Sequence, residues 1–207
     1  MLPLADALAH PLVAHLAASL AAREPRLADV AHVEPAPRRA AVAVVLRVDA
    51  EREEPAVEVL FIKRAEYEGD PWSGHVAFPG GRHEPGDESL WHTAARETRE
   101  EIGLDLHADG RLLGALDEVF PRSQRIPSMV VRPYVAVAAP AAPLVLSDEV
   151  AAVFWVPVRR LTEPTASVTS TVRAHGLELR VPSFVHEGHT IWGMTDRVLR
   201  QLLELLG

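Results

Sequence analysis

Residues 80–104 read GGRHEPGDESLWHTAARETREEIGL, and this stretch carries most of what the chain reveals about its fold. It predicts a glycine-rich loop followed by a helix from about Glu88 to Ile102, with Asp87 as the N-cap and Gly103 at the C-terminal end. At 100° per residue, one arc of this helix should face the core, and it comprises Trp91, Ala94, Ala95, Thr98 and Ile102.

An adjacent arc of the same helix carries three carboxylates, Glu97, Glu100 and Glu101. This arrangement is locally unfavourable, because like charges repel at i,i+4 spacing and the last turns of a helix are already negative. Arg96 offsets part of the repulsion by pairing with Glu100. Clustered carboxylates suit a hard divalent cation such as Mg²⁺, which takes oxygen ligands and accepts phosphates as co-ligands. A solvated acidic face is the alternative interpretation, and the preceding glycine loop argues against it.

Elements on both sides of this loop and helix indicate an α/β (α+β) fold. Strand patterns rich in Val and Leu cover residues 40–48, 57–62, 111–119, 129–137, 150–156 and 177–185. The first two are expected to form a hairpin, and an amphipathic helix over 196–206 closes the chain. This order favours a mixed sheet between helices over a regular βαβ repeat. No internal repeat or break in composition divides the chain, so residues 1–207 are expected to form a single domain.

Composition narrows the functional classes. The chain has 207 residues, with 21 basic and 29 acidic side chains, a formal net charge of −8 and no cysteine. The missing cysteines exclude a disulfide scaffold, a thiolate metal site and a cysteine nucleophile. The acidic balance argues against a surface that coats nucleic acid. No apolar run reaches the roughly 18 residues of a membrane span, so we expect a cytoplasmic protein with neither nucleic acid nor membrane as a partner.

The first 34 residues are expected to form an N-terminal helical extension, which a proline-marked linker separates from the first strand. Leu12, Leu16 and Leu20 recur at a spacing of four and predict a short amphipathic helix. The apolar face of this helix can pack either on its own domain or on a second subunit. Closed twofold assemblies are the commonest oligomers, so we expect a homodimer.

The loop and helix resemble the signature of the Nudix hydrolases, which cleave a nucleoside diphosphate linked to another group. The resemblance covers 80–104 and rests on Gly81, Glu88, Arg96, Glu97, Glu100, Glu101, Gly103 and Leu104. It implies a Nudix-like α/β/α sandwich with a central mixed β-sheet and a catalytic helix after the glycine loop. The loop is one residue longer than the general pattern, so either Asp87 or Glu88 fills the loop-stabilising role.

A second set of residues resembles the coenzyme A pyrophosphatase branch of that family. Phe78-Pro79-Gly80-Gly81, with Arg64 upstream, looks like the substrate-loop signature of the branch, and Ile191-Trp192-Gly193 is similar to its C-terminal element. The branch has a threonine where this chain has Ile62, and its second arginine is absent near residues 69–70. The resemblance implies coenzyme A or an acyl derivative as the substrate. ADP-ribose, a nucleotide sugar and a nucleoside triphosphate are the alternatives.

The family resemblance also implies a mechanism. Mg²⁺ or Mn²⁺ held by Glu97, Glu100 and Glu101 would neutralise the diphosphate and acidify a bound water, which attacks one phosphorus. Arg96 would orient these acids. Gly80 and Gly81 would let the backbone pass close to the metal and the phosphates.

Residues outside the helix complete the expected site. Glu149 is the candidate for a further base or metal ligand, and Arg122 and Arg125 are candidates for phosphate contacts. A non-catalytic nucleotide-binding module is the rival function from another class, although no acid of the motif is replaced. A structural or partner-binding protein is a third alternative, and it gives no reason for the paired glycines.

Overall fold

The computed structural model describes residues 2–51, 55–68, 72–121, 128–139, 143–174 and 176–207. Its helices are α1 (Leu4–Ala9), α2 (Pro11–Ala21), α3 (Leu90–Ile102), α4 (Val158–Leu161) and α5 (Gly193–Glu204). Its strands are β1 (Arg38–Asp49), β2 (Ala56–Arg64), β3 (Val76–Ala77), β4 (Gly80–Arg82), β5 (Gly110–Ala115), β6 (Met129–Ala138), β7 (Val150–Pro157), β8 (Ser167–Ala174), β9 (Leu177–His186) and β10 (His189–Trp192).

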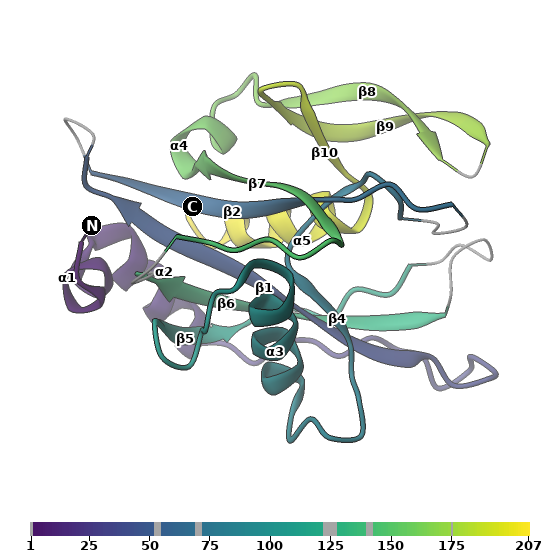
Figure 1. Cartoon of the computed structure of the whole chain (residues 1–207), viewed down its shortest axis with the longest axis horizontal. Coiled ribbons are helices and arrows are strands. Elements are labelled where there is room, and N and C mark those ends of the chain that lie inside the picture. The colour runs from purple at the N-terminus through teal and green to yellow at the C-terminus, as the bar shows by residue number, and fades with distance from the viewer. Residues whose placement is uncertain (1, 52–54, 69–71, 122–127, 140–142, 175) are drawn as a thin grey trace.

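A mixed sheet forms the centre of the molecule (Figure 1). Its strand order is β3-β2-β1-β6-β5, and in addition β4 pairs with β1 and β7 pairs with β2. The strand β1 runs parallel to β6 and antiparallel to β2 and β4. The predicted hairpin of the first two strands is therefore confirmed, and so is the mixed character of the sheet.

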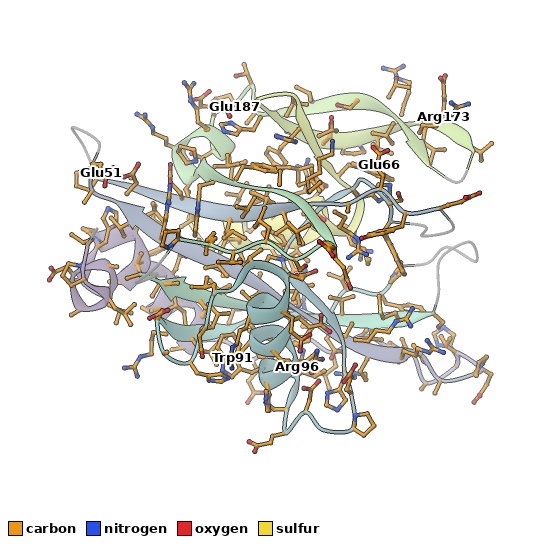
Figure 2. All side chains as sticks on the ribbon, in the orientation of Figure 1. Glu51, Glu66, Trp91, Arg96, Arg173 and Glu187 are labelled. Carbon is orange, nitrogen blue, oxygen red and sulfur yellow. The ribbon has the colours of Figure 1, made fainter. Side chains whose placement is uncertain are left out.

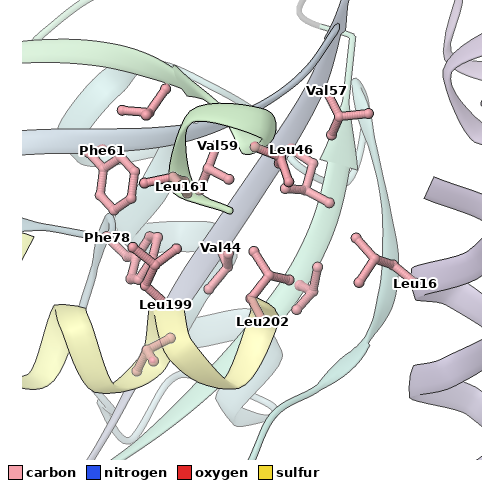
Figure 3. Packing of buried hydrophobic residues seen from close by; sticks show 14 of the residues in the cluster. Leu16, Val44, Leu46, Val57, Val59, Phe61, Phe78, Leu161, Leu199 and Leu202 are labelled. Atoms are coloured by element: carbon pink, nitrogen blue, oxygen red, sulfur yellow. The ribbon is translucent and has the colours of Figure 1, made fainter. Parts of the chain in front are cut away.

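Side chains of β1 alternate between two separate hydrophobic cores, one on each face of the sheet. Val44 and Leu46 point to one face, where helices α1, α2, α4 and α5 contribute buried side chains (Figure 3). Ala43 and Val45 point to the opposite face, where they meet Ile102 of α3. Helices therefore cover both faces of the sheet, as the expected α/β/α sandwich requires.

The N-terminal helices pack on this chain's own sheet. Leu16 and Leu20 of α2 are buried in the core, and a Cβ on Gly114 of β5 would come within 2.8 Å of the Leu20 side chain. The guanidinium of Arg26 pairs with Asp117 at 2.6 Å, just beyond β5. The apolar face that the sequence left open to a second subunit is thus covered within the chain. The homodimer stays a prediction.

A second, three-stranded sheet in the order β10-β9-β8 lies beside α5. The sequence predicted β9, but α1, α4, β8 and β10 escaped it because they are short or largely polar. At the N-terminal end of α5, the Thr195 hydroxyl donates to the Val76 carbonyl at 2.9 Å, which fastens this helix to β3. Among the described helices, none is long and apolar enough to cross a bilayer.

Candidate active site

The two glycines of β4 allow close approaches on two sides: Gly80 lies against β1, and Gly81 lies against the Glu97 side chain of α3. A Cβ on Gly80, whose φ is +147°, would lie 2.3 Å from the Ala41 carbonyl oxygen of β1. A Cβ on Gly81 would lie 2.4 Å from the Glu97 Oε1 atom of α3. Both distances are far below van der Waals contact, so any larger residue would push the strand or the carboxylate away.

Helix α3 begins later than the sequence predicted. It starts at Leu90, and the N-cap is Ser89, whose hydroxyl accepts from the His92 amide at 3.1 Å. The predicted N-cap, Asp87, lies before this point and has other partners. The C-terminal end matches the prediction, because Gly103 adopts the left-handed conformation with φ of 71°.

Asp87 is the acid that stabilises the glycine loop. Its Oδ1 accepts from Arg96 Nε at 2.9 Å, and its Oδ2 accepts from Arg96 Nη2, from the Thr93 hydroxyl and from the Glu84 amide at 2.9–3.1 Å. The Arg96 guanidinium holds the pKa of this buried carboxyl well below its ordinary value, with the Glu84 amide and the Thr93 hydroxyl adding to the effect. Glu88 is exposed. The extra loop residue therefore leaves the acid with the shorter side chain in the stabilising role.

Arg96 connects the loop to the acidic face of α3. Besides Asp87, its guanidinium reaches Glu100 Oε2 at 3.0 Å and Glu97 Oε1 at 3.1 Å, and it donates to the Arg82 carbonyl at 3.1 Å. Figure 2 labels Arg96 on this helix. The side chain is thereby fully engaged with neighbouring groups, and these contacts fit an orienting role.

Glu101 is buried at the C-terminal end of α3 and is the most perturbed acid of the site. Its Oε2 accepts from the Gly80 amide at 2.9 Å, and Arg64 Nη1 lies 4.0 Å from its other oxygen. Burial raises the pKa of Glu101 to about 8, against the opposing effect of the Gly80 amide. Burial also raises the pKa of Glu97. Both carboxylates are therefore costly to keep as anions.

Glu149 lies in a different part of the sequence from α3 but is close enough to act electrostatically on its acids. It precedes β7, and the Ala65 amide donates to its carbonyl at 2.8 Å. Its carboxylate contributes to the raised pKa values of both Glu97 and Glu101, although burial is the larger cause in each. The structure thus gathers acids from α3 and from the segment before β7, far apart in the sequence.

Some candidates from the sequence lie elsewhere. Phe78, grouped with the substrate loop, is instead a core residue: it is only 3% exposed and stacks on Phe61 with ring centroids 4.9 Å apart. Phe78 directly follows β3 and packs in the same core as Val76, whereas Ala77 between them packs against the core on the other face of the sheet. Arg122 and Arg125 lie outside the described residues, as do positions 69–70. Sequence reasoning missed Tyr67, which lies in the loop after β2 and contacts the segment that carries Glu149.

The acids fit a divalent cation by their chemistry. They supply hard oxygen donors, and a cation would relieve the cost of burial and the mutual repulsion that raise their pKa values. In the described part of the chain, however, no three acidic or histidine side chains converge tightly enough to ligate one ion. Glu100 accounts for part of this, since its side chain is 59% exposed and turned to Arg96. Glu97 and Glu101 are the α3 acids that lie against Gly81 and Gly80, and Glu149 helps to raise the pKa of both.

Comparison with known proteins assigns the chain to a family. The model of the NUDIX domain matches residues 37–173. The chain belongs to the NUDIX domain family. It is similar to the mitochondrial coenzyme A diphosphatase NUDT8 of Homo sapiens, with 32% identity over 82% of this chain and 70% of that protein. The same protein of Mus musculus is 31% identical over 82% and 79% of the two chains.

Other Nudix proteins agree with this assignment. A Nudix hydrolase NudL of Yersinia pestis, itself uncharacterized, is 31% identical over 81% of this chain and 79% of its own length. A NUDIX hydrolase from Alicyclobacillus acidocaldarius shares the fold with a TM-score of 0.53, at 22% identity over 83% and 93% of the two chains. As a Nudix hydrolase, the chain is a pyrophosphatase, and enzymes of this family generally use divalent metals.

Proposed function

We propose that the chain hydrolyses the diphosphate linkage of coenzyme A or an acyl derivative, giving 3′,5′-ADP and a phosphopantetheine. The observation that carries the proposal is the buried Glu101 carboxylate, which accepts from the Gly80 amide and whose pKa is raised by burial, with Glu97 and Glu149 adding to the effect. The relatives named as coenzyme A diphosphatases support the choice of substrate, because they match across most of this chain. The substrate-loop and C-terminal stretches described above support the same branch.

The residues of the site divide the work. A divalent cation, Mg²⁺ or Mn²⁺, would supply charge neutralisation for the diphosphate and a more acidic water when bound. Glu97 and Glu101 would hold this cation with Glu149 or Glu100, and Arg96 fixes the direction of the α3 carboxylates. Positioning and charge neutralisation account for most of the rate in phosphoryl transfer, and no covalent intermediate on the chain is required.

Two glycines and one arginine next to the carboxylates shape the place where the substrate would bind. Gly80 and Gly81 keep side chains away from the carboxylates: the Gly80 amide donates to Glu101, and a Cβ on Gly81 would lie 2.4 Å from Glu97 Oε1 and displace that carboxylate. The Arg64 guanidinium stands 4.0 Å from Glu101 and supplies a positive charge at the same edge. An anionic substrate can therefore meet a cationic side chain beside the acids.

A competition assay tests the proposed substrate. Equal amounts of coenzyme A, ADP-ribose, a dinucleoside polyphosphate and NADH are incubated together with the protein and Mg²⁺ or Mn²⁺, and the products are resolved by chromatography. We expect coenzyme A to be consumed first, with 3′,5′-ADP released in equal amount to the phosphopantetheine. Survival of coenzyme A while another compound is consumed would refute the substrate and leave the family intact. A parallel reaction with Glu101→Gln controls for contaminating hydrolases.

A further inference from the structure

The segment that carries Glu149 is attached to α3 by its own backbone. The Ser147 amide donates to the Glu101 carbonyl at 2.9 Å, and the Val145 amide donates to the Ile102 carbonyl at 3.0 Å. Within the segment, the Glu149 amide donates to the Ser147 hydroxyl at 3.3 Å. Two backbone hydrogen bonds therefore attach the segment to the C-terminal end of α3, which carries the acids.

The opposite side of the segment is attached to the loop after β2. The Ala65 amide donates to the Glu149 carbonyl, and the Tyr67 hydroxyl donates to the Asp148 carbonyl, each at 2.8 Å. Figure 2 labels Glu66, which lies between these two residues in the chain. The loop thus holds two consecutive carbonyls, one of them through a side chain.

Tyr67 is positioned to hold the Asp148 carbonyl rather than to pack in the core. It is 49% exposed, so its ring contributes less to the core than a buried aromatic would. Its own backbone is fixed, because the Tyr67 amide donates to the Ser73 hydroxyl at 2.9 Å. A tyrosine side chain has only two rotatable bonds before its ring, so the hydrogen bond from its hydroxyl restrains the Asp148 carbonyl relative to the loop.

We propose that Tyr67 is a positioning residue, which holds the Asp148–Glu149 backbone so that the Glu149 carboxylate stands beside Glu97 and Glu101. The Glu149 side chain is exposed, so neighbouring atoms constrain it little and its position depends on its backbone. The catalytic meaning of this role rests on the proposed function. The mechanical role itself depends only on the contacts of the Tyr67 hydroxyl.

A double-mutant cycle tests the proposal through Mn²⁺ binding, measured by electron paramagnetic resonance of the free ion. Tyr67→Phe removes only the hydroxyl and should raise the Mn²⁺ dissociation constant about 2- to 10-fold, the equivalent of one net hydrogen bond. Glu149→Gln should also raise it, and adding Tyr67→Phe to Glu149→Gln should have no further effect. An unchanged constant in Tyr67→Phe, or independent effects in the double variant, would overturn the proposal.

Two control variants separate the effect of the Tyr67 hydroxyl contact from general loosening of the loop. Ser73→Ala releases the Tyr67 amide but leaves the hydroxyl, and Tyr134→Phe makes the same chemical change at the chain's other tyrosine. Tyr134→Phe should bind Mn²⁺ as the unaltered protein does. Ser73→Ala frees the Tyr67 amide but keeps the contact of the Tyr67 hydroxyl, so it should raise the dissociation constant less than Tyr67→Phe does. If Ser73→Ala weakens binding as much as Tyr67→Phe, loosening of the loop explains the result and the proposal fails.

Hydrogen exchange provides a readout that needs neither metal nor substrate. The amides of Ser147 and Val150 are hydrogen-bonded, and they should exchange faster in Tyr67→Phe than in Ser73→Ala. Equal exchange in the two variants would overturn the inference. In turnover assays, Tyr67→Phe should lower kcat and leave KM unchanged. If the unaltered protein hydrolyses no diphosphate compound, the proposed function fails, while the exchange comparison still decides the role of Tyr67.

Discussion

Replacing Asp87 by Asn should destabilise the protein far more than replacing its neighbour Glu88 by Gln. Both changes remove one negative charge from adjacent positions of the glycine loop. Asp87 is buried and accepts four hydrogen bonds, two of them from the Arg96 guanidinium. Glu88 is exposed, and its side chain contributes to none of these bonds. The comparison therefore isolates the loop-stabilising acid.

The magnitude follows from the partners that each group loses. An asparagine can keep the three bonds at the Oδ2 position, but its amide then faces the Arg96 Nε donor. Removing one partner of a buried ion pair costs about 3–5 kcal/mol. Arg96 keeps Glu97 and Glu100 and is partly exposed, so we expect about 2–3 kcal/mol, close to one charged hydrogen bond. The exposed change should cost less than about 0.5 kcal/mol.

Thermal and urea unfolding of the three proteins measures these differences. For a chain of this size, the expected loss for Asp87→Asn corresponds to a fall in Tm of about 4–12 °C. Because Asp87 has a lower pKa in the folded protein than the unfolded value of about 3.9, its charge stabilises above that pH. This stabilisation is lost as the pH falls through the folded pKa, so the gap between the proteins should shrink in acid. A larger loss for Glu88→Gln would refute the assignment.

Four other experiments test separate parts of the site and core. Gly81→Ala places a Cβ against the Glu97 carboxylate and should lower the rate of diphosphate hydrolysis at least tenfold. Gly86→Ala is the control, because a Cβ there meets nothing within 4 Å, and it should leave the rate unchanged. Equal rates in the two variants would contradict the close approach of Gly81 to Glu97. Phe78→Ala should lower the free energy of unfolding, measured in urea, by about 3–5 kcal/mol and leave KM unchanged. A raised KM in a variant that stays stable would show that Phe78 contacts the substrate after all. Chelation should abolish activity and Mg²⁺ or Mn²⁺ should restore it. Because the pKa of Glu101 is raised to about 8, metal affinity by calorimetry should rise with pH toward that value, and a flat profile would contradict the burial of this acid.

The periodicity of apolar side chains was enough to predict the long helices and strands. The apolar arc of α3, the hairpin of β1 and β2 and the buried face of α2 follow from side chains repeating at the period of their own element. The short strands β3 and β4 have too few residues for any period to appear, and their pairing depends on β1 and β2. Of these two strands, β4 places Gly80 and Gly81 against the carboxylates.

The site required distances that no local pattern contains. The three glutamates of α3 were visible as one helix face, but the sequence could not show that Glu100 turns to Arg96 while Glu101 turns to the Gly80 amide. The choice between Asp87 and Glu88 likewise depended on which side chain reaches Arg96. The hydroxyl of Tyr67 contacts a carbonyl 81 residues away, and only the folded chain brings the two together.

The central claim is that the carboxylates at the end of α3 form the site of diphosphate hydrolysis. The most direct measurement is the rate of 3′,5′-ADP release from coenzyme A, with Mg²⁺, by Glu101→Gln and by the unaltered protein. The account predicts a fall in turnover by orders of magnitude for Glu101→Gln, with Tm kept, because the neutral amide fills the same buried space and can still accept from the Gly80 amide. Full turnover of coenzyme A by the folded Glu101→Gln protein would contradict it.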